Sequence, residues 1–149
     1  MKNQPTVSII IPVYKVARVL EDVLASIYNQ TYPIAEIILV DNHSPDDSAS
    51  VARRFASNHK NIPIRIIERK KIYGLSDSCN LGATLARTTH VVTIHSDGLL
   101  PSKYELDKLM KPFRADPTIV AAGPILVHRL VEWRGYNFWQ KCLFASTVE

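Results

Sequence analysis

The sequence predicts an α/β domain in which a mostly parallel sheet carries helices on both faces. Apolar runs rich in β-branched residues alternate with segments of helical period, in the order βαβαβαβαβ. The runs are almost continuously apolar, which is typical of strands buried on both faces of a parallel sheet. A length of 149 residues, 46% of them hydrophobic and 21% charged, fits one globular domain with a substantial core.

Composition and charge exclude several classes of protein. Two cysteines are too few for a disulfide-stapled scaffold, and no apolar run approaches the roughly 18 residues of a membrane span. The polar N-terminus leads us to expect no signal peptide. The net charge of +4 is mild, and the basic run at residues 69–71 has no interleaved aromatic residues, so we expect no nucleic-acid partner. We expect a cytoplasmic protein, with the cytoplasmic face of a membrane as the second location.

The first strand is predicted over residues 7–11, which are almost entirely β-branched and apolar. Pro12 is expected to end it. From Ala17 onward apolar residues recur every four positions, the spacing of one stripe on a helix. That stripe consists of Val19, Leu20, Val23, Leu24, Ile27 and Tyr28. Pro33 is expected to close this unit.

The second and third strands are predicted over residues 36–40 and 64–67, both rich in isoleucine. Between them Ser44 has the features of a helix N-cap, with Pro45 at the first helical position. The apolar side of this helix consists of Val51, Ala52, Phe55 and Ala56.

The second half of the chain continues the alternation. A helix is predicted over residues 74–87, a fourth strand over residues 91–94 and a fifth over residues 119–122. Ser102 and Glu105 have the spacing of a capping box at the start of a helix between the last two strands. The apolar stripe of the first of these helices consists of Leu75, Cys79, Ala83 and Ala86.

The predicted domain covers residues 1–130. Residues 131–149 contain both tryptophans and are expected to begin an acceptor region or to form an amphipathic segment. Three alternatives stay open for their aromatic side chains: packing on a further part of the protein, pairing of two copies of the chain, or contact with a membrane.

The carboxyl ends of the strands are the first candidates for a binding site, because ligands of open parallel sheets bind there. Residues 12–14, 41–43 and 95–98 follow three of the predicted strands. Asp41 and Asp97 lie beside buried strands, where a carboxylate needs a metal, a ligand donor or a helix N-terminus as partner. The glycine-rich turn of a dinucleotide site and the phosphate-loop pattern are both absent, so a bound diphosphate would be held by a metal and side chains.

Five segments carry motifs in a defined order. Residues 7–14 form an opening V-S-I-I-I-P-V-Y strand, and residues 26–33 follow the pattern S-h-x-x-Q-T-Y-P, where h is hydrophobic. Residues 36–46 are similar to E-I-I-V-V-D-D-G-S-T-D, and residues 74–82 match G-h-S-x-A-x-N-x-G. Residues 95–97 stand at the position of an Asp-x-Asp motif. Together the motifs resemble family-2 glycosyltransferases of the GT-A fold, whose nucleotide-binding domain is Rossmann-like.

The resemblance implies an inverting glycosyltransferase that moves a sugar from a nucleoside-diphosphate-sugar donor to a glycan, lipid or protein acceptor. It also implies that Asp41 accepts a hydrogen bond from a uracil or guanine N–H, and that Asp97 helps to hold Mn²⁺ or Mg²⁺ on the diphosphate. Two roles stay open for His95: a weaker ligand of the same metal, or a hydrogen-bond partner of the groups that hold it. The alternative is a non-catalytic nucleotide-sugar-binding or assembly module. The predicted nucleotide-binding residues are Pro12, Val13, Tyr14, Asp41, Asn42, Ser78 and Ser96.

The chain departs from the family pattern in three respects. His95 replaces the first Asp of Asp-x-Asp, and because imidazole is a poor Mg²⁺ ligand, the preferred metal stays open. Asn42 replaces the second Asp of D-D-G-S and removes a charge. Inverting members carry a carboxylate base in the acceptor half, well after Asp-x-Asp. Glu132 is the only interior candidate for that base, so we expect a truncated chain that lacks the base and is inactive alone.

Overall fold

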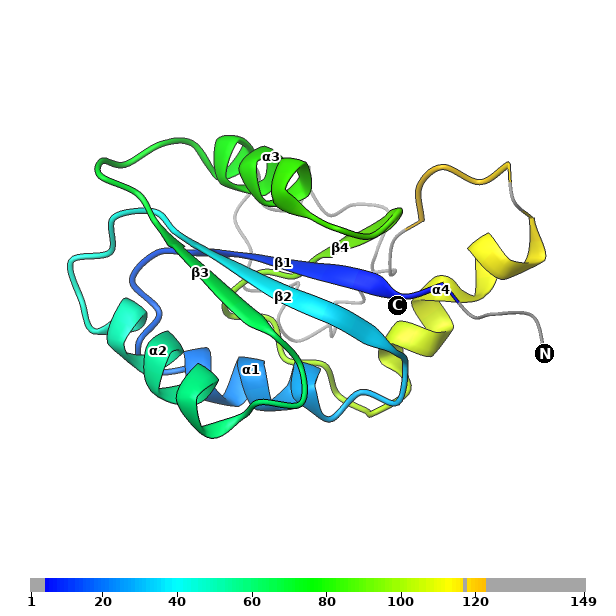
Figure 1. Ribbon diagram of the computed structural model, residues 1–149, viewed down its shortest axis with the longest axis horizontal. Coiled ribbons are helices and arrows are strands. Elements are labelled where there is room, and N and C mark those ends of the chain that lie inside the picture. Colours follow the sequence, from blue (N-terminus) through cyan, green and yellow to red (C-terminus); the bar gives the residue numbers. More distant parts are fainter. Residues whose placement is uncertain (1–4, 117, 123–149) are drawn as a thin grey trace, which may run out of the picture. The chain divides into compact units, whose positions relative to one another are not determined.

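The computed structural model describes residues 5–116 and 118–122. Within them a four-stranded sheet has the strand order β3-β2-β1-β4, and every pairing is parallel (Figure 1). The strands are β1 (Val7–Val13), β2 (Ile34–Asp41), β3 (Ile64–Glu68) and β4 (His90–Thr93). The helices are α1 (Leu20–Tyr28), α2 (Ser48–Asn58), α3 (Leu75–Leu85) and α4 (Glu105–Ala115). The predicted α/β class and parallel sheet are confirmed.

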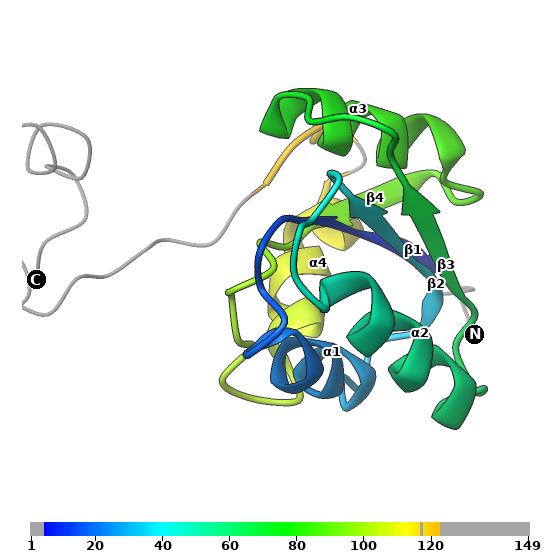
Figure 2. The same ribbon diagram turned by 90° about the vertical axis from the view of Figure 1, so that its left-hand side faces the viewer.

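Helices cover both faces of the sheet. α1 and α2 pack together on one face, and α3 packs against β1 and β2 on the other (Figure 2). The sheet and these three helices belong to one compact unit that ends at Lys108. No helix in the described part of the chain has the length and apolar character needed to cross a membrane. The predicted boundary at residue 130, the aromatic segment 131–149 and Glu132 lie outside the described residues.

β1 and β2 form the centre of the core. Every residue of β1 is buried, and so are the last six residues of β2. Ile9 and Ile10 lie beside Ile37 and Ile38 in the parallel register. Burial on both faces is the reason why these strands are mostly apolar and do not alternate between apolar and polar residues.

Pro12 lies inside β1 and does not end the strand as predicted. The carbonyl of Ile10 accepts a hydrogen bond from the Ile94 N–H at 2.9 Å, so Ile10 faces the β4 side of the ladder. Pro12, two residues on, faces the same side, where the paired register with β4 has already ended at Thr93. The N–H that proline lacks therefore removes no ladder hydrogen bond.

α3 packs on the sheet through small residues, and its predicted apolar stripe is wrong. The buried residues of α3 are Ser78 and Gly82, whereas Leu75 is 53% exposed. A Cβ atom on Gly82 would lie 2.4 Å from Cγ2 of Ile10. The helix backbone thus approaches β1 so closely that only glycine fits, and the larger residues of the stripe lie away from the sheet.

The start of α2 also differs from the prediction, because Ser44 does not cap it. The helix begins at Ser48, whose N–H and Oγ–H both lie within hydrogen-bond distance of the Asp46 carboxylate, at 3.2 and 2.5 Å. Ser44 instead accepts a hydrogen bond from the Lys15 N–H at 3.3 Å. A tertiary contact has replaced the local cap that the sequence suggested.

The fifth strand predicted over residues 119–122 is wrong: these residues form no strand, and Val120 is 95% exposed. A short apolar run forms a strand only where a neighbouring strand takes up its backbone hydrogen bonds. The capping box predicted from Ser102 and Glu105 is not formed in the expected way: α4 begins at Glu105 itself, and the Ser102 hydroxyl donates to the Glu105 carboxylate at 2.5 Å.

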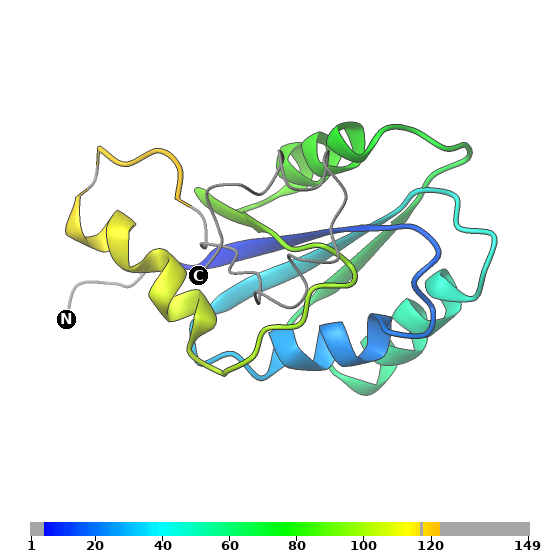
Figure 3. The ribbon, with the colours of Figure 1, turned by 180° about the vertical axis from the view of Figure 1, so that it is seen from behind.

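The segment after β4 returns from the carboxyl end of the sheet to the end of α1, where α4 begins (Figure 3). The Gln30 side chain holds it there, donating to the Ser102 carbonyl at 2.7 Å and accepting from the Leu106 N–H at 3.1 Å. The Thr31 N–H donates to the Lys103 carbonyl at 2.9 Å. These bonds give the Q-T pair of the first-helix motif a physical role: it anchors the segment that continues from residues 95–98.

The amino end of the sheet is closed by a buried carboxylate, Glu36. It accepts hydrogen bonds from Ser8 Oγ at 3.0 Å, the Arg87 N–H at 2.8 Å and Arg65 Nη1 at 3.0 Å. Arg65 also donates to the Leu85 carbonyl at 2.8 Å. Burial alone raises the pKa of Glu36, but these hydrogen bonds outweigh it and hold the pKa below its ordinary value. The network joins β1, β2, β3 and the end of α3.

Replacing Glu36 by Gln should lower the free energy of unfolding at neutral pH by about 1–3 kcal/mol, because Arg65 loses its carboxylate partner. The lowered folded-state pKa means that the stabilisation exists above the ordinary pKa and disappears as the pH falls through the folded-state pKa. The difference in unfolding free energy between the wild type and Glu36→Gln, measured by urea unfolding, should therefore become smaller in acid. Glu21→Gln, in the exposed pair with Arg54, is the control, with less than about 0.5 kcal/mol expected. A gap independent of pH would contradict this account.

Gly82→Ala should destabilise the protein by about 1–3 kcal/mol in urea unfolding, although alanine is the better helix former. In the double variant with Ile10→Ala, the loss of unfolding free energy should be smaller than the sum of the losses in the two single variants. The reason is that the methyl group added at residue 82 enters the space left by the shortened Ile10 side chain. Ala83→Gly, at an exposed position of the same helix, measures helix propensity alone. Strictly additive losses would show that the two positions do not touch.

Candidate functional site

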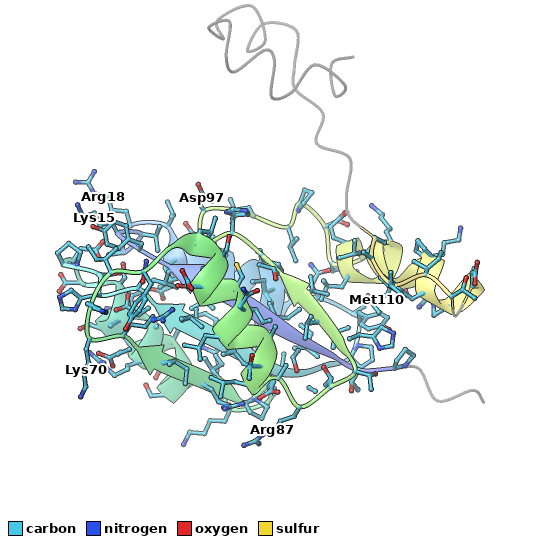
Figure 4. The ribbon with its side chains drawn as sticks, turned by 90° about the horizontal axis from the view of Figure 1, so that it is seen from above. Lys15, Arg18, Lys70, Arg87, Asp97 and Met110 are labelled. Carbon is cyan, nitrogen blue, oxygen red and sulfur yellow. The ribbon has the colours of Figure 1, made fainter. Side chains whose placement is uncertain are left out.

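A cavity of about 400 Å³ opens at the carboxyl end of the sheet. Four segments line it: the end of β1, the start of the loop after β2, the residues that lead into α3, and the turn after β4. Figure 4 shows Asp97 toward the same end of the molecule as Lys15 and Arg18. The lining residues are Pro12, Val13, Tyr14, Val16, Asn42, Ile72, Tyr73, Leu75, Ser78, His95, Ser96 and Asp97.

The loop after β1 is fastened by side chains from the loop after β2 and from the first residue of α2. Besides the bond from Lys15 to Ser44, the Val16 N–H donates to Ser48 Oγ at 3.0 Å and the Ala17 N–H donates to Asp46 Oδ2 at 3.1 Å. These bonds satisfy backbone groups that no strand or helix takes up. The wall of the cavity formed by residues 12–16 is therefore tied to the neighbouring loop.

Both of these loops contain a residue in the left-handed backbone region. Lys15 has φ 55° and His43 has φ 60°. The backbone of a residue other than glycine is strained in this region, and strain of this kind concentrates at functional loops. It also explains why the family pattern D-D-G-S has glycine at the position that His43 occupies here.

Three buried side-chain atoms in the described residues have no hydrogen-bond partner, and all three belong to this end of the sheet. They are Asp41 Oδ1, Arg69 Nη1 and Ser78 Oγ. Asp41 is 5% exposed, and only its other oxygen is paired, with the Ser44 N–H at 3.2 Å. Each unpartnered buried group costs about 1–3 kcal/mol. Of the three residues, Ser78 lines the cavity.

The entry to α3 forms an apolar wall. Ile72 and Leu75 line the cavity although they are 58% and 53% exposed. Tyr73 lies between them with the Arg69 guanidinium 3.6 Å from its ring centre. Apolar walls with a few polar groups are typical of small-molecule sites.

The turn after β4 presents the two predicted metal ligands. The Gly98 N–H donates to the His95 carbonyl at 3.0 Å and closes the turn. Ser96 is buried, whereas His95 and Asp97 are exposed and line the cavity. No group of three or more metal-binding side chains gathers within the described residues. One carboxylate and one imidazole nevertheless suit a divalent ion that takes its remaining ligands from water and a phosphate.

All predicted site residues except Asp41 line the cavity; Asp41 lies buried at the end of β2. The sequence reasoning missed Val16 and the wall formed by Ile72, Tyr73 and Leu75. Leu75 was expected to face the core as part of the stripe of α3. Its exposure follows from the close packing of Gly82 on β1, which no local pattern reveals.

The sequence matches the profile of Glycosyl transferase family 2 over residues 8–145. A PGL/p-HBAD biosynthesis glycosyltransferase of Mycobacterium bovis is 38% identical over 97% of this chain and 56% of the relative. The uncharacterized glycosyltransferase EpsJ of Bacillus subtilis is 36% identical over 66% of this chain and 28% of the relative. The chain thus spans between 28% and 56% of the length of these two relatives.

Solved structures share the fold. The mannosyltransferase PcManGT of Pyrobaculum calidifontis, in complex with GDP-Man and Mn²⁺, superposes with a TM-score of 0.74 at 31% identity, over 79% of this chain and 34% of that one. A TarS fragment of S. aureus in complex with UDP-GlcNAc has a TM-score of 0.65 at 18% identity, over 74% of this chain and 31% of that one, a similarity of fold alone. With the profile match over most of its length, the chain belongs to glycosyl transferase family 2.

Proposed function

We propose that this chain is the donor-binding part of an inverting glycosyltransferase that uses a nucleoside-diphosphate sugar. The observation that carries the proposal is the cavity at the carboxyl end of the sheet, into which the opening strand, the entry to α3 and the turn at residues 95–98 all contribute. GDP-Man in PcManGT supports a donor of this class. The acceptor (a glycan, lipid or protein), the cytoplasmic location and any pairing of chains stay predictions from the sequence.

The apolar walls would hold the nucleoside. The unpartnered Asp41 Oδ1 would accept a hydrogen bond from the ring N–H of uracil or guanine. Adenine and cytosine offer an unprotonated ring nitrogen at the corresponding position, which a carboxylate repels. Arg69 Nη1 and Ser78 Oγ are the remaining unpartnered atoms for the polar groups of the nucleotide.

His95 and Asp97 would hold a divalent ion on the diphosphate. When bound, such an ion stabilises the negative charge of the leaving nucleoside diphosphate. The imidazole of His95 favours Mn²⁺ over Mg²⁺, since Mg²⁺ prefers oxygen ligands. Ser96, buried between the two ligands, helps to define the turn that presents them.

In the transfer step an acceptor hydroxyl oxygen would bond to the anomeric carbon as the bond from that carbon to the diphosphate oxygen breaks. The hydroxyl proton passes to a carboxylate base on the far side of the sugar. Within the described residues Asp97 is the one carboxylate that lines the cavity. We therefore assign the base to an acceptor-binding part of the whole protein. The relatives are longer than the region that matches this chain, which covers 28% and 56% of their lengths.

Isothermal titration of the protein with UDP- and GDP-sugars in the presence of Mn²⁺ tests donor binding, and one of the two classes should give saturable heat. Asp97→Ala should remove the part of the affinity that depends on Mn²⁺, about tenfold or more. Asp22→Ala, an exposed carboxylate on α1, is the matched control and should bind like the parent. Absence of heat with every donor would reject the proposal, and an unchanged Mn²⁺ dependence in the Asp97 variant would reject the metal assignment.

Asp41→Asn should weaken the binding of the nucleoside diphosphate about tenfold, both with and without Mn²⁺, because an amide replaces the carboxylate that accepts the base N–H. The same change removes a buried charge that has an unpartnered oxygen, so the free energy of unfolding should rise, by about 1 kcal/mol. Titration and urea unfolding measure the two effects. A parallel loss of stability and binding would indicate a structural role for Asp41.

A further inference from the structure

The side chain of Asn42 forms a two-point contact with the backbone of Tyr73. Asn42 Nδ2 donates to the Tyr73 carbonyl oxygen at 2.7 Å, and the Tyr73 N–H donates to Asn42 Oδ1 at 2.9 Å. Asn42 is 8% exposed and lies directly after β2. One side-chain amide thus satisfies both backbone groups of a single loop residue.

This contact continues the pairing between β2 and β3 beyond the ends of the two strands. β2 pairs with β3 up to Glu68, and the last backbone bond of that pair runs from the Arg69 N–H to the Asp41 carbonyl at 2.9 Å. Beyond it the Asn42 amide supplies the donor and the acceptor that a strand would otherwise supply. A carboxylate at this position could accept from the N–H but would repel the carbonyl, so the chemistry requires an amide.

The wall of the cavity depends on this link. Ile72 and Leu75 flank Tyr73 and line the cavity, yet more than half of each side chain is exposed, so little packing of their own holds them in place. Tyr73 itself is held on two sides, by the Asn42 amide at its backbone and by the Arg69 guanidinium 3.6 Å from its ring centre.

We propose that Asn42 is a positioning residue that sets the width of the nucleoside cavity by fixing the wall at residues 72–75, and so determines which size of base the cavity accepts. The inference rests on the proposed function. It changes the role predicted for Asn42 from the sequence: the amide acts on the ligand through Tyr73. The part of the lining at residues 12–16 is fastened by other hydrogen bonds.

Amide hydrogen exchange on the ligand-free protein tests the link itself. In Asn42→Ala the Tyr73 N–H should exchange about tenfold faster, while the Ile10 and Ile38 amides in the sheet keep their protection and show that the protein is folded. Asn58→Ala, at an exposed position of α2, is the control and should leave Tyr73 unchanged. Unchanged exchange of Tyr73 in the Asn42 variant would overturn the proposal.

Nucleotide selectivity tests the consequence. Titrations with UDP and GDP should show a preference for one base in the wild type, and in Asn42→Ala and Asn42→Asp the ratio of the two Kd values should fall at least fivefold, with the effect of Mn²⁺ unchanged. Equal weakening of both nucleotides would overturn the proposal, since it would indicate a direct contact or general damage. If the wild type binds neither nucleotide, the proposed function fails, whereas a failure of the link alone appears as unchanged Tyr73 exchange.

Discussion

The parallel pairing of β1 with β2 on one side and β4 on the other is the constraint on which the rest of the molecule depends. Because the strands run in one direction, the loops that leave β1, β2, β3 and β4 all start from the same end of the sheet. Burial on both faces holds the strands in register, and α3 can cover β1 only because Gly82 lets the two backbones approach. A cavity lined by residues from Pro12 to Asp97, 85 positions apart in the sequence, follows from this arrangement.

The two ends of the sheet differ in how their buried polar groups are paired. At the amino end Glu36 is buried, and its hydrogen bonds join three strands and the end of α3, so that end contributes stability. At the carboxyl end Asp41, Arg69 and Ser78 each bury a polar atom without a partner. Buried groups that are left unpaired weaken the fold unless a ligand satisfies them. The two ends thus differ in how completely their buried polar groups are hydrogen-bonded.

Most of the fold and most of the cavity could be predicted from the sequence. The apolar runs of β1 and β2 and the helical periods are local signals. They predict where the strands end, and therefore that residues 12–14, 41–43 and 95–98 lie at one edge of the sheet. The failures share one cause. The predicted stripe of α3 and the predicted cap at Ser44 rest on local pattern, whereas contacts with Ile10 and Lys15, far away in the sequence, determine how Gly82 packs and what Ser44 bonds. The strand predicted over residues 119–122 rests on local pattern alone as well.

The sequence by itself determined the class of fold, the order of the elements and which residue types gather at the strand ends, because period and apolar character are properties of neighbouring residues. Only the tertiary structure determined which contacts those side chains make. Asn42 was recognisable as a departure from a charged pattern, but its partner, Tyr73, lies 31 residues away. Hydrogen bonds over such separations depend on how strands and loops meet in space, and no local pattern contains that information.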